Sequence, residues 1–249
     1  MSGPDPRLAA DILDRLLLRD LPSLYGIGDP KEFKRLFCLL ALNGGREISL
    51  EGLAGSTGIA KNTLRRYLDY LQAAFLIRRL NRLDQNAKPF RRQGFFKPYL
   101  AHPALHAGLF GPTGVDDPAY GGLVETAVLA ALPASTASLS YARWPDGAVT
   151  FVTGGMPEPS AAIEVRWSDA PFERPREELA AYVGFCRRQP GLTRRIVCGR
   201  NARGSRHFLG MEIEFIPAAA FCLADPGATR DESAPISSPE PSPDASATH

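Results

Sequence analysis

The sequence predicts an α/β protein, α+β overall, in which a winged helix-turn-helix is followed by a mixed-sheet domain. Three observations predict this fold class. Residues 50–73 carry the apolar pattern of two short helices around a glycine-containing turn, and two strand-like segments follow directly. Residues 121–198 then read as helix, three strands, helix and strand. With 249 residues, the chain has room for one large domain or two small ones.

Composition divides the chain into four expected segments. Residues 1–30 form a helical lead-in, 31–110 the winged helix-turn-helix domain and 111–224 the second domain. Residues 225–249 contain five prolines and five serines and have a net charge of −4. Such a segment buries too little apolar surface to offset the entropy of ordering it. We therefore expect a disordered, acidic Pro/Ser-rich tail.

The first helices are indicated by caps and breakers. An apolar run that ends at Leu42 predicts a helix beginning near Lys31, and the sequence Asn43-Gly44-Gly45 ends it. Ser49 is a typical N-cap for a short helix over residues 50–56. A tight turn at residues 57–59 leads to the next helix.

The second helix of the pair spans residues 60–73 by its periodicity. Four apolar residues recur at steps of three and four and should face the core, namely Leu64, Leu68, Leu71 and Phe75. The opposite side carries the candidate DNA-contacting residues Lys61, Asn62, Arg65 and Arg66. In a helix-turn-helix the second helix enters the major groove with its N-terminal residues against the bases.

A hairpin after this helix would make it a winged helix. Residues 76–83 form the first predicted strand and residues 95–100 its partner. Arg91 and Arg92 lie near the expected tip of the wing, where arginines reach phosphates or the minor groove.

The charge distribution favours a polyanionic partner. The net charge is +9 over residues 31–110, against −2 before this window and −5 after it. A basic module between acidic neighbours is typical of nucleic-acid binding, so DNA is the expected partner. The alternative is a winged helix that serves only as a protein-docking scaffold.

The second half alternates strands and helices as a mixed sheet does. The predicted helices span residues 121–132 and 174–188. The predicted strands span residues 138–143, 148–153, 161–167, 195–198 and 211–216. A turn at residues 145–147 joins the first two of these strands.

Glu164 and Arg166 stand two residues apart on the third of these strands and should project from the same face. Opposite charges on an otherwise apolar strand are costly unless they are used. Nucleases of the PD-(D/E)XK class use this spacing, with carboxylates that hold Mg²⁺ and a lysine that positions the attacking water. The pattern is short, and many strands contain it by chance.

Five motifs in order carry a family resemblance: Arg19-Asp20-Leu21-Pro22, the helix-turn-helix of residues 53–68, Tyr99-Leu100-Ala101-His102-Pro103, Gly122-Leu123-Val124-Glu125 and Ile163-Glu164-Val165-Arg166. Over roughly residues 10–200 the chain resembles the uncharacterised C-terminal region behind the AAA-type P-loop module of many prokaryotic ATPases. The resemblance implies a winged helix joined to a restriction-endonuclease-like domain. It would place an ATPase module before Leu8, and we expect this chain to lack it.

The resemblance assigns nuclease-type positions to Glu125, residue 150, Glu164 and residue 166. Two of them depart from the expected pattern, because Thr150 replaces an acidic residue and Arg166 replaces a lysine. Only Glu125 and Glu164 remain as metal ligands if the domain is active. Arg cannot lose its proton to act as a base, although it can orient a phosphate. Arg166 could instead pair with Glu164 as a structural ion pair.

The sequence thus favours a DNA-binding protein with a degenerate nuclease-like domain that needs no cofactor. One alternative is a nuclease that uses Mg²⁺ despite Thr150 and Arg166. The other is an interaction module that docks onto a separate AAA-type ATPase or onto itself. No GxxxxGK[ST] pattern is present, so we expect no ATPase activity from these residues.

The remaining features indicate a cytoplasmic location. No apolar run is long enough for a membrane span, and the N-terminus lacks the order of a signal peptide. The cysteines have no CxxC spacing and should be buried free thiols: Cys38, Cys186, Cys198 and Cys222.

Overall fold

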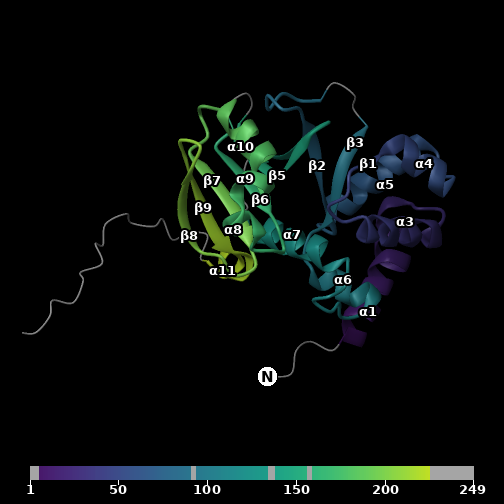
Figure 1. The fold of residues 1–249 in the computed structure, drawn as a ribbon. Coiled ribbons are helices and arrows are strands. Elements are labelled where there is room, and N and C mark those ends of the chain that lie inside the picture. The colour runs from purple at the N-terminus through teal and green to yellow at the C-terminus, as the bar shows by residue number, and fades with distance from the viewer. Residues whose placement is uncertain (1–5, 91–93, 134–137, 156–158, 225–249) are drawn as a thin grey trace, which may run out of the picture.

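The computed structural model describes residues 6–90, 94–133, 138–155 and 159–224. Over these residues the chain is a mixed α/β structure built on one nine-stranded sheet, in the order β1-β3-β2-β4-β5-β6-β7-β9-β8. The helices of the first half lie at one end of this sheet and β8 lies at the other (Figure 1). The predicted mixed sheet is therefore present.

The sheet is mixed because it contains both parallel and antiparallel strand pairs. Three pairs are parallel, β2 with β4, β6 with β7 and β7 with β9, and the others are antiparallel. The strands are β1 (Ile48–Ser49), β2 (Ile77–Leu83), β3 (Phe95–Leu100), β4 (Leu139–Trp144), β5 (Gly147–Thr153), β6 (Ala161–Val165), β7 (Arg194–Gly199), β8 (Gly204–Phe208) and β9 (Met211–Pro217).

The helices of the first half pack into a cluster against the β2–β3 hairpin. They are α1 (Pro6–Arg15), a π-helical turn η1 (Leu16–Asp20), α2 (Leu21–Tyr25), α3 (Pro30–Leu42), α4 (Leu50–Thr57), α5 (Lys61–Ala73) and α6 (Ala104–Phe110). The expected cap is confirmed, because the Ser49 hydroxyl accepts a hydrogen bond from the Gly52 N–H at 2.9 Å. The turn before α5 uses Gly58 in the left-handed conformation, with φ of 74°.

The prediction that Phe75 faces the core of this unit is wrong. Leu64, Leu68 and Leu71 are buried, but Phe75 is 84% exposed. The helix α5 ends at Ala73, and Phe75 adopts a left-handed backbone with φ of 54°. This turn redirects the chain into β2, so the ring no longer continues the apolar stripe of the helix.

The predicted hairpin is confirmed, and it is also part of the larger sheet. Strands β2 and β3 pair antiparallel from Ile77 opposite Leu100 to Asn81 opposite Phe96. On its other edge β2 pairs parallel with β4, with Asn81 opposite Ser140. The sheet therefore continues without a break across the expected boundary at residue 110.

The second half adds helices to both faces of the sheet. They are α7 (Tyr120–Ala131), α8 (Ala170–Glu173), α9 (Pro175–Glu178), α10 (Ala180–Arg187) and α11 (Ala218–Leu223). The single helix predicted over residues 174–188 is wrong, because it is interrupted between α9 and α10 at Leu179. Leu179 has non-helical dihedral angles (φ −113°, ψ 6°) and a fully buried side chain.

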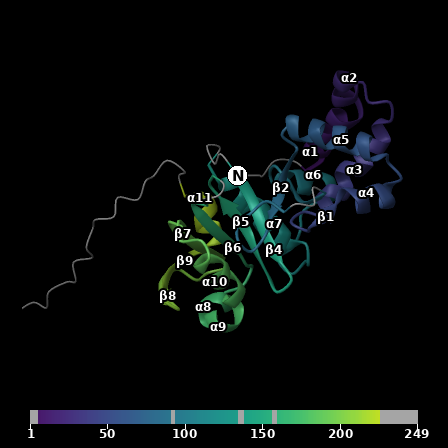
Figure 2. The same ribbon diagram turned by 90° about the horizontal axis from the view of Figure 1, so that it is seen from above.

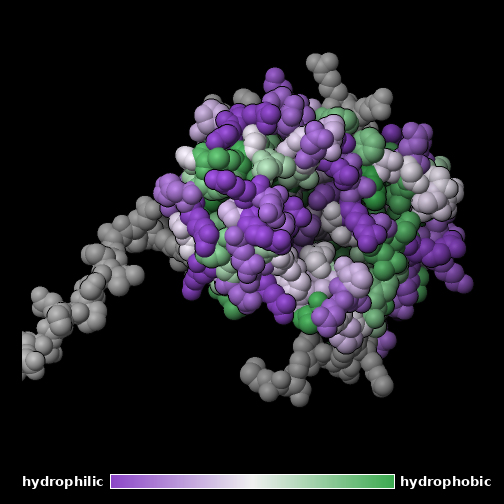
Figure 3. Space-filling view, viewed as in Figure 1, coloured by the Kyte–Doolittle hydropathy of each residue, from purple (hydrophilic) through white to green (hydrophobic). Residues whose placement is uncertain are grey.

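Three apolar clusters form the core. The first holds the helices of the N-terminal half against β2 and β3. The second lies under α10, and the third lies between α7, α11 and the opposite face of the sheet. Figure 2 shows α8, α9 and α10 together on one side of β7 and β9, with α11 on the other. Hydrophilic residues cover much of the face drawn in Figure 3.

The cysteines are free thiols, as predicted, but only two of them are buried. Cys186 and Cys198 are buried, whereas Cys38 and Cys222 are partly exposed. Burial raises the pKa of Cys198 to about 12, so this thiol stays protonated. None of the described helices has both the length and the apolar character to cross a membrane.

Candidate functional site

The N-terminal turns of α5 form the first candidate surface. All four residues predicted to contact DNA are exposed there: Lys61, Asn62, Arg65 and Arg66. Lys61 Nζ lies 2.7 Å from Glu51 Oε1 of α4, and Arg65 Nη1 donates to Asn62 Oδ1 at 2.8 Å. Among the described residues no carboxylate pairs with Arg65 or Arg66. The positive charge of this surface is therefore carried mainly by these two guanidinium groups.

Several other cations of the basic window already have partners within the protein. Lys34 pairs with Asp14 at 2.5 Å, and Arg79 pairs with Asp69 at 2.6 Å. Arg78 donates to the carbonyl of Leu129. The Asp69–Arg79 pair is already counted in the net charge of +9 over residues 31–110. Asp14 lies outside this window, so its pair with Lys34 lowers the positive charge available to a ligand. Arg91 and Arg92, predicted at the wing tip, lie outside the described residues.

The residues that the sequence predicted at nuclease-type positions on β5, on β6 and directly after β6 come together around Glu164. Its Oε1 lies 2.9 Å from Arg166 Nε. Its Oε2 accepts hydrogen bonds from the N–H of Thr150 at 3.0 Å and from its hydroxyl at 3.2 Å. Glu164 and Arg166 therefore form the structural ion pair that the sequence left open as an alternative to a catalytic role. Both oxygens of this buried carboxylate have protein partners.

The fourth nuclease-type residue, Glu125 on α7, is held by the first half of the chain. Its Oε2 accepts a hydrogen bond of 2.6 Å from the hydroxyl of Tyr99 on β3. A Cβ on Gly45 would lie only 2.7 Å from the same oxygen, so the turn before β1 packs directly against the carboxylate. Glycine at position 45, with φ of 74°, permits this close approach.

Burial dominates the electrostatics of both carboxyl groups. Desolvation raises the pKa of Glu164, and Arg166 opposes the increase. Desolvation likewise raises the pKa of Glu125, while Lys97 and the Tyr99 hydroxyl lower it. Arg166 also lowers the pKa of Glu125, and the Glu125 charge raises that of Glu164. The two carboxylates and the guanidinium therefore act on one another electrostatically.

This set of donors does not fit Mg²⁺. The ion prefers several oxygen ligands in an octahedral arrangement, and carboxylates are its usual protein ligands. Thr150 is already hydrogen-bonded to Glu164, and the fixed positive charge of Arg166 occupies one carboxylate oxygen. Within the part of the chain that the structure describes, no group of three His, Cys, Asp or Glu side chains could hold a metal ion.

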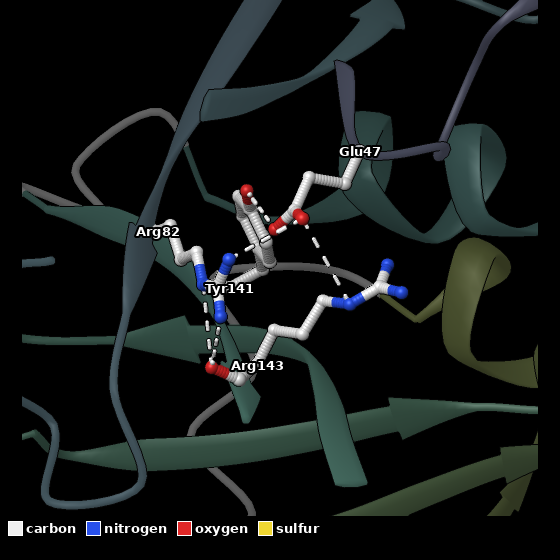
Figure 4. Close-up of polar contacts among 4 residues, drawn as sticks. All are labelled: Glu47, Arg82, Tyr141 and Arg143. Atoms are coloured by element: carbon white, nitrogen blue, oxygen red, sulfur yellow. Dashed lines mark hydrogen bonds and ion pairs between the residues drawn. The ribbon is translucent and has the colours of Figure 1, made fainter. Parts of the chain in front are cut away.

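A second polar cluster, around Glu47, joins the two halves of the sheet and was not predicted from the sequence. Figure 4 shows the carboxylate between the hydroxyl of Tyr141 and the guanidinium groups of Arg82 and Arg143. Tyr141 donates to Glu47 Oε2 at 2.8 Å, and Arg82 and Arg143 lie 3.4 and 3.8 Å from Oε1. Glu47 lies in a short connection before β1, where no pattern marks it as functional.

Two residues of β3 connect these clusters. Lys97 Nζ lies 5.3 Å from the centre of the Tyr141 ring, and Tyr99 binds Glu125. Sequence reasoning placed both residues on a strand but gave neither a role. Successive residues of a strand point to opposite faces of the sheet. Lys97 and Tyr99 alternate with the buried Phe96 and Pro98, and this pattern could have shown that both face the second half.

Comparison with protein families gives one result. Residues 3–116 match the model of a family described as a domain of unknown function, DUF8612. The matched segment covers the helices of the first half and the β2–β3 hairpin, and it ends before α7. Comparison with curated proteins and with solved structures finds no match.

Proposed function

We propose that this protein binds duplex DNA through α5 and that its second half is a restriction-endonuclease-like domain without nuclease activity. The observation that carries the proposal is the exposed polar face of α5, where Arg65 and Arg66 have no acidic partner among the described residues. Asn62 beside them offers an amide that can read base edges.

The arrangement around α5 supports a winged helix-turn-helix. Helix α4, the left-handed Gly58 turn and α5 follow one another directly, and the β2–β3 hairpin comes next. The second helix of such a motif lies in the major groove, with its first residues toward the bases. Lys61 and Asn62 begin α5, so the exposed polar residues are those that would face the groove.

The second half supports the nuclease-like interpretation through its order of elements. Helix α7, strands β4, β5 and β6, the short helices α8 and α9, helix α10 and strand β7 follow in sequence. Three of the proposed nuclease-type positions lie on α7, β5 and β6, and Arg166 directly follows β6. The protein itself satisfies the carboxylate of Glu164, which removes the need for a cation there. A separate AAA-type ATPase or a second copy of the chain remains a proposed partner of this DNA-binding module.

Salt dependence tests the DNA-binding half of the proposal. Binding of a fluorescent duplex should weaken linearly on a log–log plot against salt, with a slope of about −0.9 for each phosphate neutralised. A slope that indicates several phosphates is the expected result. An interaction that is undetectable at low salt, or that does not change with salt, would favour the protein-docking alternative.

A cleavage assay tests the proposal that the second half of the chain has no nuclease activity. Plasmid and single-stranded DNA should remain intact with either Mg²⁺ or Mn²⁺. Cleavage that disappears in Glu164→Ala would instead establish the nuclease alternative.

Restoring the acidic residue and the lysine expected at positions 150 and 166 gives a more direct test. The double variant Thr150→Asp with Arg166→Lys should bind Mg²⁺ in calorimetry, whereas the unchanged protein should not, because the variant regains a carboxylate and loses the guanidinium. Failure of a well-folded double variant to bind Mg²⁺ would contradict descent from a metal site.

A further inference from the structure

A groove of about 530 Å³ runs between α5 and the β2–β3 hairpin. Its α5 wall carries Arg65, Asp69 and Gln72, and its other wall carries Asn81, Phe90 and Phe95. Arg65 therefore belongs both to the proposed DNA-contacting face and to this groove. The volume is in the range of small-molecule sites, which span about 300–1,000 Å³.

The polar wall of the groove is held in place by Arg79. This guanidinium binds Asp69 through Nη2 at 2.6 Å and Gln72 through Nε. Asp69 and Arg79 neutralise each other, which leaves Arg65 as the cation of this wall that has no acidic partner among the described residues. The amide nitrogen of Gln72 and the exposed amide of Asn81 are hydrogen-bonding groups, and amides can pair with the polar edge of a base.

The opposite wall is aromatic and is also fixed. The rings of Phe90 and Phe95 meet edge to face, with centroids 6.3 Å apart, and both residues are partly exposed. The guanidinium of Arg82 lies 4.1 Å from the centre of the Phe90 ring. Arg82 is anchored in turn by Glu47 and by the carbonyl of Arg143. The ring of Phe90 is therefore positioned before any ligand arrives.

Two of the arginines that line the groove, Arg79 and Arg82, are already paired with Asp69 and Glu47, and phenyl rings offer no hydrogen bond to a sugar–phosphate strand. The phenyl rings suit a base that has left the stack, because every base offers a π-face to an aromatic side chain. Bases inside a duplex are already stacked and cannot reach such a groove. Arg65 at the junction with the α5 surface provides a cation for the phosphate of that nucleotide.

We propose that this groove binds one unpaired nucleotide next to the duplex on α5. The protein would then prefer duplexes that carry a single-stranded overhang. The inference rests on the proposed DNA binding of α5 for its duplex part, whereas the groove itself is a separate feature. A nucleobase with a phosphate also occurs as a free nucleotide, so the experiment separates the two sources.

The test compares a blunt duplex with the same duplex extended by a short overhang containing a fluorescent adenine analogue. The overhang should tighten binding about fivefold or more, as expected for one stacked base, and the fluorescence of the analogue should be quenched. Phe90→Leu should abolish both effects and leave the affinity for the blunt duplex unchanged. Phe90→Trp should preserve them, and equal melting temperatures of the two variants control for folding.

The outcomes separate the two proposals. Equal affinity for the two duplexes, or a gain that survives in Phe90→Leu, overturns the nucleotide groove while DNA binding by α5 stands. If adenosine monophosphate alone raises the melting temperature and Phe90→Leu removes this increase, the groove takes a free nucleotide. The unchanged protein could also fail to bind the blunt duplex and still bind the overhang duplex or adenosine monophosphate in a way that Phe90→Leu removes. That result would overturn the proposed function, and the nucleotide groove would stand.

Discussion

The face of α5 and the cluster around Glu164 contain similar residue types in opposite surroundings. On α5 the guanidinium groups of Arg65 and Arg66 are exposed and lack acidic partners among the described residues. Around Glu164 the carboxylate is buried and both of its oxygens accept bonds from the protein. A charged side chain is available to a ligand only where the fold leaves it exposed and unneutralised.

The two regions should therefore respond differently to mutation. A buried charge that loses its partner keeps its desolvation cost, so changes near Glu164 should appear as lost stability. An exposed cation stabilises the fold little, so changes on α5 should alter affinity and leave stability unchanged. Each of the following experiments tests one side of this contrast.

The largest effect is expected from Arg166→Ala. Breaking a buried ion pair costs about 3–5 kcal/mol, and the half-exposed side chain of Arg166 reduces this to about 2–3 kcal/mol. Urea unfolding of the variant measures the loss. Arg166→Lys is the matched control, because it retains a cation near Glu164 and should lose less.

The loss should also depend on pH. Burial raises the pKa of Glu164, and removing Arg166 raises it further. When the pKa of a carboxyl group is higher in the folded than in the unfolded state, the free energy of unfolding of the protein falls as pH rises from the unfolded-state pKa through the folded-state pKa. The deficit of Arg166→Ala should therefore be larger at mildly alkaline pH than at mildly acidic pH. A deficit that is constant with pH would show that the lost contact is not electrostatic.

Tyr99→Phe tests the contact between the two halves of the sheet. The hydroxyl of Tyr99 donates to Glu125 at 2.6 Å, and hydrogen bonds to charged groups contribute about 1.5–3 kcal/mol. Unfolding by urea should show a loss in this range. Tyr70→Phe is the control, because within the described residues the Tyr70 ring stacks on Tyr25 and its hydroxyl has no hydrogen bond. Equal losses in the two variants would contradict a role for the hydroxyl.

The local helices, strands and caps were predictable from the sequence, and the long-range contacts between them were not. Ser49 as a cap, the strand over residues 95–100 and the shared face of Glu164 and Arg166 all follow from short-range rules. The parallel pairing of β2 with β4 joins residues about sixty positions apart, which no local pattern encodes. The partners of Glu47 lie on β2 and β4 and depend on that pairing, and the partner of Glu125 depends on how α7 packs against β3. Neither set could be found from the sequence.

On the exposed side of the contrast, Arg65→Ala combined with Arg66→Ala should weaken duplex binding at least about tenfold, or about 1.4 kcal/mol. If both groups contact phosphates, the salt slope should fall by about 1.8. Fluorescence anisotropy measures both quantities, and the melting temperature should not change. Arg187→Ala with Arg188→Ala, an adjacent exposed pair on and next to α10, is the matched control. An equal effect of the control pair would indicate binding that is not localised to α5.

The smallest effect is expected at Phe75, where exposure is combined with an unfavourable backbone. Its φ of 54° is in the left-handed region, which costs a residue with a Cβ about 1–2 kcal/mol. Glycine has no such cost, but it loses more conformational entropy on folding. Phe75→Gly should therefore stabilise the protein by about 0.5–1 kcal/mol in urea unfolding. Phe75→Ala removes the same exposed ring and keeps the Cβ, so it should give no such gain. Because Phe75 follows the C-terminal end of α5, duplex binding should be the same in both variants, and a loss of affinity would extend the binding face along the whole helix.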